Sequence, residues 1–333
     1  MRRLALAVLV CVGCVGCGAA GSGGGTDAGA ATTASTSATA SASASPSVEP
    51  GTVVPVGKGP VGLAADSDGS VWVAQAGASS VSRIRGGKVD LQVKGIDVPL
   101  RLAAADGSVW ATAFGTGELV RISATSGEVT HRIPVGKGAE GVTVDLGSVW
   151  VVAQDAGKLV RVDPSTSAVA GTADIGVGAR LVTTGGGAVW VSHYANGTVL
   201  RVDPATLAVT TSPRICGGPQ GIVATGEAVW VACTTDNVVV RLDPATWEVT
   251  ARVTTPTAPD GLVAGPDGRL RLVAQQGPTL VVIDPNTDAV VSQQALGILP
   301  QLYDRANLAV AVTAEATWVS SFSADAVHRL AAG

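Results

Sequence analysis

Gly147-Ser148-Val149-Trp150-Val151 is the stretch that decides the fold, because variants of it return along the whole chain. Each copy places a tryptophan inside a short valine-rich run, and in one copy Arg271 takes the tryptophan position. From residue 72 through 110, 150, 190, 230, 271 and 318, the spacings are 38, 40, 40, 40, 41 and 47. A period near 40 is typical of repeats that each form one small sheet. The tryptophans of the repeat are Trp72, Trp110, Trp150, Trp190, Trp230 and Trp318.

Each repeat predicts four short strands separated by glycine or proline turns. In the third repeat these are Gly138–Val142, Gly147–Val151, Leu159–Pro164 and a β-rich run that ends near Gly176. Runs of about 5 to 7 residues are too short for helices of the usual length. Seven such repeats predict an all-β fold, a seven-bladed β-propeller, over residues 51–333.

The two ends of this region predict how the ring closes. The last repeat has a second strand at Thr317–Phe322 and a third at Ala326–Leu330, but no fourth strand follows. Thr52–Val56 matches the end of a fourth strand elsewhere, such as Arg132–Val135. We therefore expect the N-terminal strand to complete the last blade.

A recurring Asp-Pro pair could be read as a metal or catalytic signature. We favour a structural role, because Asp followed by Pro is typical of type I turns and the pair falls where the third strand must reverse. The repeated tryptophan also has a structural interpretation, since one per blade would fill the wedge between neighbouring sheets. The pairs begin at Asp163, Asp203, Asp243 and Asp284.

The first residues resemble a bacterial lipoprotein signal. Met1-Arg2-Arg3 precedes a short apolar run, which ends in Cys14-Val15-Gly16-Cys17. The run is shorter than the roughly 20 residues of a membrane span and has the length of an export signal. We expect residues 1–17 to be the signal and Cys17 to be the lipid attachment site, with Cys14 as the second candidate. An ordinary secretory signal is the alternative.

Residues 18–50 are almost wholly Gly, Ala, Ser and Thr. Such a segment cannot bury enough apolar surface to offset its ordering entropy, so we expect a disordered tether. With the signal, it predicts an exported domain held on the outer face of the cell membrane.

The formal net charge is −4 at pH 7, and no Lys or Arg cluster follows the signal. Nucleic-acid binding depends on neutralising phosphates, so we expect no nucleic acid partner. We also expect a monomer without a cofactor or a resident metal.

The chain has only two Phe and two Tyr residues. In a propeller, the connections from fourth to first strand and from second to third strand share one face, here called the top face. We expect all four rings near this face, as a binding surface or as caps on the core. They are Phe114, Tyr194, Tyr303 and Phe322.

A second set of candidates lies where each first strand begins, next to its glycine or the equivalent position. One side chain per blade should converge there on the central channel, as ligand-binding groups or as solvated loop positions. Arg101 lies beside this ring, and His193 ends a second strand. The ring comprises Val61, Leu100, Glu140, Arg180, Gln220, Asp260 and Leu308.

Cys216 precedes the first strand of the fifth blade, and Cys233 ends its second strand. Both should lie on the top face. In an exported protein such a pair is expected to form a disulfide, with free thiols or a metal pair as alternatives.

Two stretches carry a family resemblance, Gly59–Leu63 with Asp68–Val73, and Gly218–Ile222 with Ala228–Val231. They resemble the repeats of the streptogramin B lyase, NHL and YVTN-type propellers, over nearly all of residues 52 to 330. The resemblance implies the propeller fold but is compatible with lyases, scaffolds and sensors alike.

The lyase members of this group have a metal-assisted site built from His and Glu on one face. No such constellation is evident around the three histidines, His131, His193 and His328. We therefore favour a module that binds a protein, peptide or cell-envelope saccharide through its top face. The alternative is a metal-assisted lyase or hydrolase with its site at the channel mouth.

Overall fold

The computed structural model describes residues 51–297 and 308–331, which belong to one compact unit, Pro46–Gly333. The predicted signal, the lipid attachment site Cys17, the tether and the candidate Tyr303 lie outside the described residues. Within those two ranges, no helix is long and apolar enough to cross a membrane.

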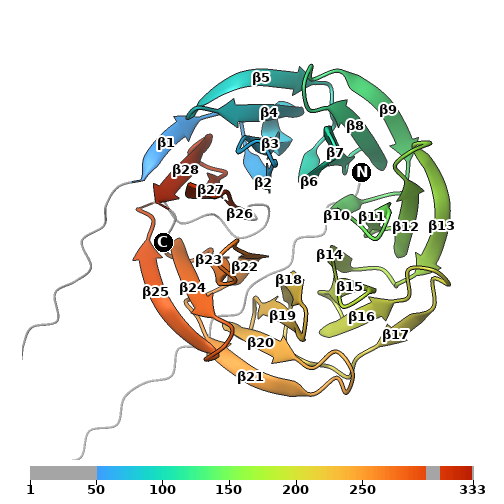
Figure 1. Ribbon diagram of the computed structural model, residues 1–333, viewed down its shortest axis with the longest axis vertical. Coiled ribbons are helices and arrows are strands. Elements are labelled where there is room, and N and C mark those ends of the chain that lie inside the picture. Colours follow the sequence, from blue (N-terminus) through green and yellow to red (C-terminus); the bar gives the residue numbers. More distant parts are fainter. Residues whose placement is uncertain (1–50, 298–307, 332–333) are drawn as a thin grey trace, which may run out of the picture. The chain divides into compact units, whose positions relative to one another are not determined.

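Seven four-stranded antiparallel sheets surround a central axis, as predicted (Figure 1). In every blade the first strand lies next to the axis and the fourth at the periphery. Blade one is β2 (Pro60–Ala65), β3 (Val71–Gln75), β4 (Ser80–Arg85) and β5 (Lys88–Lys94). Blade two is β6 (Pro99–Ala105), β7 (Ser108–Ala113), β8 (Glu118–Ser123) and β9 (Val129–Pro134). Blade three is β10 (Ala139–Asp145), β11 (Ser148–Ala153), β12 (Lys158–Asp163) and β13 (Ala168–Asp174).

The remaining blades follow the same order. Blade four is β14 (Ala179–Gly185), β15 (Ala188–His193), β16 (Thr198–Val202) and β17 (Val209–Thr211). Blade five is β18 (Pro219–Thr225), β19 (Ala228–Cys233), β20 (Val238–Leu242) and β21 (Val249–Thr254). Blade six is β22 (Pro259–Ala264), β23 (Leu270–Ala274), β24 (Thr279–Asp284) and β25 (Ala289–Ala295). Blade seven is β26 (Val310–Val312), β27 (Ala316–Ser321), β28 (Ala326–Ala331) and β1 (Thr52–Pro55).

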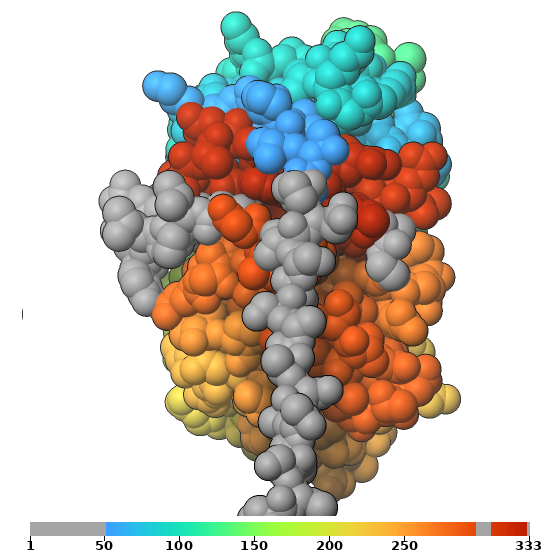
Figure 2. Space-filling view, turned by 90° about the vertical axis from the view of Figure 1, so that its left-hand side faces the viewer, coloured from blue at the N-terminus to red at the C-terminus, as the bar shows by residue number. Residues whose placement is uncertain are grey.

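The N-terminal strand closes the ring, which confirms the prediction. β1 pairs antiparallel with β28, from Thr52 opposite Arg329 to Pro55 opposite Ala326. In space-filling view the blue N-terminal segment lies directly against the red C-terminal strands (Figure 2). Its residue Val54 is 2% exposed and packs in the core between blades seven and one. The two ends of the domain therefore share one sheet, so neither can separate without opening the ring.

The repeated tryptophans are buried between neighbouring blades. Trp110 of blade two, for example, packs against Val149, Val151 and Val160 of blade three. In blade six Arg271 occupies the equivalent position, and its guanidinium pairs with Asp267 in the preceding turn. The alignment of this residue with the tryptophans is thus confirmed.

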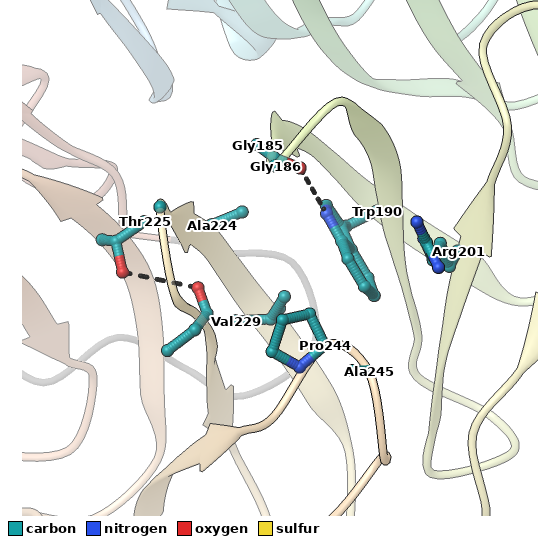
Figure 3. A pocket seen from close by; sticks show the side chains of 11 residues that line it. Gly185, Gly186, Trp190, Arg201, Ala224, Thr225, Val229, Pro244 and Ala245 are labelled. Carbon is teal, nitrogen blue, oxygen red and sulfur yellow. Dashed lines mark hydrogen bonds between the residues drawn. The ribbon is translucent and has the colours of Figure 1, made fainter.

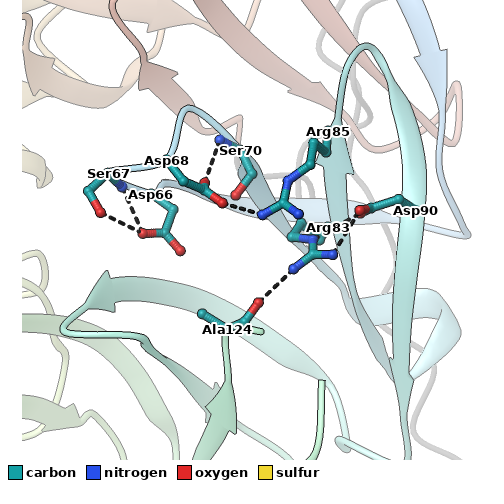
Figure 4. A network of polar contacts seen from close by, with 8 residues as sticks. All are labelled: Asp66, Ser67, Asp68, Ser70, Arg83, Arg85, Asp90 and Ala124. Carbon is teal, nitrogen blue, oxygen red and sulfur yellow. Dashed lines mark hydrogen bonds and ion pairs between the residues drawn. The ribbon is translucent and has the colours of Figure 1, made fainter. Parts of the chain in front are cut away.

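Each blade tryptophan has an arginine opposite it on the third strand, a pattern that our sequence interpretation missed. The cross-strand pairs place the guanidinium 5.0 to 5.9 Å from the indole centre. Several of these arginines also reach the next blade. Figure 4 shows Arg83, which is held by Asp90 of its own blade and donates to the Ala124 carbonyl of blade two at 2.6 Å. The arginines are Arg83, Arg121, Arg161, Arg201, Arg241 and Arg329.

The Asp-Pro pairs are turns. The carboxylate of Asp203 accepts hydrogen bonds from the backbone N–H groups of Ala205 and Thr206, at 2.9 and 2.8 Å. Asp243 makes the same two bonds one blade later. These bonds hold the pKa of both carboxyls below the ordinary value. They turn the chain from the third to the fourth strand and support the structural interpretation.

Candidate functional site

A cavity of about 950 Å³ opens on the top face at the mouth of the channel. Residues from both kinds of connection line it, such as Val98 between β5 and β6, and Phe114 after β7. This arrangement confirms that the two kinds of connection emerge on one face. The volume lies within the range of small-molecule sites, about 300 to 1,000 Å³.

One lining position recurs in all seven blades, four residues after the blade tryptophan or Arg271. We call these residues the rim ring. The sequence analysis selected only its aromatic members and missed the others, although the same spacing would have found them. The rim ring comprises Ala76, Phe114, Gln154, Tyr194, Thr234, Gln275 and Phe322, and all seven line the cavity.

The predicted ring at the start of each first strand, here the inner ring, lies closer to the axis. In six blades the register between first and second strands shifts at this point, for example between Ala139 and Val142. A bulge leaves extra residues unpaired and re-aims their side chains, which explains how one side chain per blade can turn toward the channel. The inner-ring residues that line the cavity are Val61, Leu100, Glu140, Arg180 and Gln220.

Buried hydroxyls on the second strands hold these bulges. Thr112 accepts a hydrogen bond from the Arg101 backbone N–H at 3.0 Å and donates to the Glu140 carbonyl of the next blade at 2.8 Å. Ser192 donates to the Gln220 carbonyl at 2.8 Å in the same way. The ring positions of adjacent blades are therefore fixed relative to each other.

The lining is divided by polarity. Blades seven, one and two contribute apolar groups, including Phe322, Val61 and Phe114, whereas blades three to six contribute Glu140 and most of the polar groups. A cavity with one apolar wall and one polar wall can hold an amphipathic ligand in a defined orientation.

Arg180, Tyr194 and Gln220 form one unit in the polar wall. The Arg180 guanidinium lies over the Tyr194 ring, 4.3 Å from its centre, and donates to Gln220 Oε1 at 3.2 Å. The Gln220 amide nitrogen Nε2 is buried and has no hydrogen-bond partner in the described part of the chain. It is a donor at the cavity wall.

The carboxylate of Glu140 is buried without a hydrogen-bond or ion-pair partner among the described residues. The Glu140 side chain lines the cavity but is only 3% exposed. Burial raises the pKa of this carboxyl, while the more distant Arg101 and Arg180 lower it. A carboxylate in such a position is costly unless something pairs with it.

Asp260 and Arg101 lie deeper than predicted and do not line this cavity. Asp260 is fully buried, and its Oδ2 accepts from Gln275 Nε2 at 2.6 Å and from the Leu308 backbone N–H at 2.7 Å. Burial raises its pKa. Arg101 lines a smaller cavity of about 320 Å³ along the channel and donates to the Val61 carbonyl at 3.3 Å. Asp260 thereby links blade six to blade seven, and Arg101 links blade two to blade one.

His193 also lies away from the cavity. It is 2% exposed at the end of β15, and its Nδ1 accepts from the Asn196 backbone N–H at 3.3 Å. Burial lowers its pKa. The other two histidines are in β9 and β28, as predicted, and neither reaches the cavity. The His193 ring lies instead beside Gly176 and Gly178, in the connection that leads into β14.

The disulfide between Cys216 and Cys233 is present, with the Cα atoms 6.0 Å apart. It joins the connection before β18 to the end of β19, directly beside the lining residue Thr234. Gly218 in this connection packs under the Tyr194 ring, and its φ of +61° is a conformation that glycine adopts without strain. The bridge thus supports one side of the cavity.

Among residues 51–297 and 308–331, no group of three or more His, Cys, Asp or Glu side chains is placed to hold a metal ion. Among these described residues, the ionisable groups at the cavity wall are one carboxylate, one guanidinium and the Tyr194 hydroxyl.

No family model and no curated protein sequence matches the chain. Solved structures do. Streptogramin B lyase superposes with a TM-score of 0.71 at 18% identity, over 84% of this chain and 96% of that one. The fold of the present chain therefore resembles that of streptogramin B lyase.

Two further structures agree with this likeness in fold. A catalytically inactive variant of virginiamycin B lyase from Staphylococcus aureus with quinupristin has a TM-score of 0.70 at 19% identity, over 84% of this chain and 98% of that one. Hydrazine synthase from Kuenenia stuttgartiensis has a TM-score of 0.72 at 13% identity, over 83% and 96%. Because proteins of different activity share the propeller, the function must be argued from the cavity itself.

A second, smaller pocket of about 180 Å³ lies between blades four and five (Figure 3). Trp190 and Pro244 face each other across it, and the Trp190 indole donates to the Gly185 carbonyl at 3.0 Å. Its lining is mostly small and apolar, and Arg201 is its single charged residue. This pocket is a packing gap between blades and offers few groups for recognition.

Proposed function

We propose that this chain is an exported, lipid-anchored β-propeller that binds a ligand in the top-face cavity. One observation carries the binding proposal: a cavity of about 950 Å³ in which side chains from all seven blades converge, with aromatic rings on its rim and a few polar groups at its floor. That combination is the usual description of a ligand site. A peptide or a cell-envelope saccharide matches the size and the mixed lining.

The anchor is proposed from the sequence. The basic start, the short apolar run and Cys17 support lipid attachment, and residues 18–50 would let the propeller reach ligands near the membrane. We propose a monomeric protein without a nucleic acid partner.

Affinity capture tests the binding proposal. The purified protein is incubated with a cell-envelope extract, and bound saccharides and peptides are identified by mass spectrometry. The triple variant Arg180→Ala, Tyr194→Ala, Phe322→Ala should capture at least tenfold less ligand than the parent. Its melting temperature should stay close to the parent's, because these side chains are only partly buried.

The matched control is Glu227→Ala, an exposed residue in the turn between β18 and β19 on the opposite face. It should capture the ligand as the parent does. Equal capture by the parent and the triple variant would contradict a site in this cavity.

Labelling with an alkyne fatty acid tests the anchor. The parent should incorporate the label and sediment with membranes, and Cys17→Ser should do neither. If Cys14→Ser alone abolishes the label, the anchor is at the other cysteine.

The enzymatic alternative is a metal-assisted lyase or hydrolase at the channel mouth, suggested by the fold shared with streptogramin B lyase. Incubation with quinupristin and calcium, magnesium or zinc, followed by mass spectrometry, tests it. Conversion that is lost in the triple variant would replace the binding proposal. The cavity supports binding better, since the described residues that line it include one carboxylate and no histidine.

A further inference from the structure

The cavity wall contains a carboxyl group that no described residue pairs with. Glu140 is 97% withdrawn from solvent by the protein yet lines the cavity, and it lacks a hydrogen-bond or ion-pair partner among the described residues. Buried carboxylates are normally paired, because losing hydration without compensation is expensive. Asp260, three positions further round the inner ring, differs from Glu140: its Oδ2 accepts from two donors, although its buried Oδ1 has no partner among the described residues.

The neighbouring arginine does not fill this role. Arg180 is engaged with Gln220 Oε1 and stacked on Tyr194, and it forms no ion pair with Glu140. Arg101 donates to the Val61 and Leu100 carbonyls instead. Both guanidiniums attract the carboxylate only from a distance.

A second acceptor lies in the same blade. Gln154 belongs to the rim ring of blade three, above Glu140, and its backbone N–H donates to the Gly138 carbonyl just before β10. Its side-chain oxygen Oε1 is buried and has no partner in the described residues. Blade three therefore presents three acceptor oxygens without a donor, two from Glu140 and one from Gln154.

The opposite wall is apolar. Phe114 and Phe322 of the rim ring, with Val61 and Leu100 of the inner ring, face the cavity from blades seven, one and two. A hydrocarbon or aromatic group on this wall would be removed from water while the polar wall is engaged.

We propose that the cavity recognises a primary amine carried on an apolar body, with the ammonium group bound by Glu140 and Gln154 and the body packed on Phe114 and Phe322. An ammonium group has three donors and matches three acceptor oxygens, and its charge balances the carboxylate. This inference rests on the proposed binding function and narrows it to cationic ligands, such as a peptide N-terminus or an amino sugar.

Fragment binding tests the inference. The probes are 2-phenylethylamine, the neutral 2-phenylethanol and the anionic 3-phenylpropionate, followed by saturation-transfer NMR and calorimetry at pH 7.5. The amine should bind at least tenfold more tightly than the alcohol, and the anion more weakly than either. n-Propylamine, which lacks the ring, should bind at least tenfold more weakly than 2-phenylethylamine.

Glu140→Gln is the decisive variant, because it preserves shape and removes the charge. It should erase the preference for the amine over the alcohol while leaving the melting temperature intact or raised. Asp155→Asn is the matched control, an exposed carboxylate of the same blade that acts on Glu140 through space and accepts one long hydrogen bond from Gln154 Nε2, at 3.4 Å, which an asparagine oxygen can also accept. It should reduce amine binding less than threefold.

The inference would be overturned if the protein showed no preference for the amine, or if that preference survived Glu140→Gln. It would also be overturned if Asp155→Asn weakened amine binding as much as Glu140→Gln does, because the amine would then be held only by the general negative charge of this region. If the alcohol or the anion binds in the cavity without amine preference, the proposed function stands and the inference fails. If no probe binds and the envelope extract yields no ligand, both fail.

Discussion

The Arg180 guanidinium carbon lies 4.3 Å from the centre of the Tyr194 ring, so a cation is held over an aromatic face at the edge of the cavity. The two residues come from different positions of blade four, the inner ring and the rim ring. Their stacking fixes the height of the guanidinium in the polar wall and leaves its edge toward Gln220.

Tyr194→Leu should release this guanidinium. In the parent, ring-current shielding should move the Arg180 Nε proton upfield in the NMR spectrum, and the variant should return it to the position of an exposed arginine. The free energy of unfolding should fall by no more than about 1 kcal/mol, the scale of such contacts near a surface. An unshifted Arg180 signal in the parent would contradict the stacking.

Val54→Asp should open the propeller ring. Val54 is 2% exposed in the core of the last blade, and a carboxylate there would lose its hydration without a partner. We expect a loss of about 3 kcal/mol or more in urea unfolding. Val53→Asp is the control on the same strand, because its side chain is 51% exposed and faces solvent. Equal losses in both variants would argue against closure by β1.

Arg161→Met should cost more stability than Arg201→Met. Both arginines lie over a blade tryptophan, at 5.9 and 5.7 Å, but only Arg161 also donates to Ser148 Oγ, at 3.0 Å, and to the Pro204 carbonyl of the next blade, at 3.2 Å. Losing these two bonds should cost about 1 kcal/mol or more beyond the shared loss of the tryptophan contact. Chemical denaturation of the two variants gives the comparison directly, and equal costs would show that the two hydrogen bonds add nothing.

The double variant Cys216→Ser, Cys233→Ser should unfold more easily. Closing a loop of 17 residues stabilises the folded state by about 3 kcal/mol in the chain-entropy description. The melting temperature should drop by roughly 6 to 12 °C at the rate typical of domains near this size. The parent under reducing agent should show the same drop, whereas a variant that melts like the oxidised parent would make the bridge dispensable.

Glu140→Gln should change how stability depends on pH. Because burial raises the pKa of Glu140 above its ordinary 4.5, the folded parent holds this proton more tightly than the unfolded chain. The parent therefore loses stability from this group as pH rises from 4.5 through the raised value, and the variant does not. The free energy of unfolding of the variant, relative to that of the parent, should therefore increase between pH 4.5 and 8.

Asp163→Asn is the control for that measurement. Hydrogen bonds from Ser165 hold the pKa of Asp163 below 3.8, so its titration falls below the tested window. The difference in free energy of unfolding between Asp163→Asn and the parent should stay constant from pH 4.5 to 8. A constant difference for Glu140→Gln as well would mean that burial does not raise the pKa of the Glu140 carboxyl.

The repeat of tryptophan and valine was enough to predict the number of blades, because a spacing near 40 residues is set by four strands and their turns, whatever the surroundings. Closure by Thr52–Pro55 and the Cys216–Cys233 bridge were also predictable, since both follow from counting strands and faces. The rim ring obeys the same periodicity, and only its members that are not aromatic were overlooked. Such features depend only on the spacing of residues along the chain, so the sequence alone predicts them.

Depth within the channel was decided by the tertiary structure. Glu140 and Asp260 hold equivalent positions in their repeats, yet Asp260 is covered by Gln275 and Leu308 while Glu140 faces the cavity without a donor. His193 ends its strand one residue before Tyr194, yet it is buried beside Gly176 and Gly178 whereas the tyrosine lines the cavity. Periodicity assigns a side chain to a face, but its burial and its partners depend on which groups the neighbouring blades bring against it.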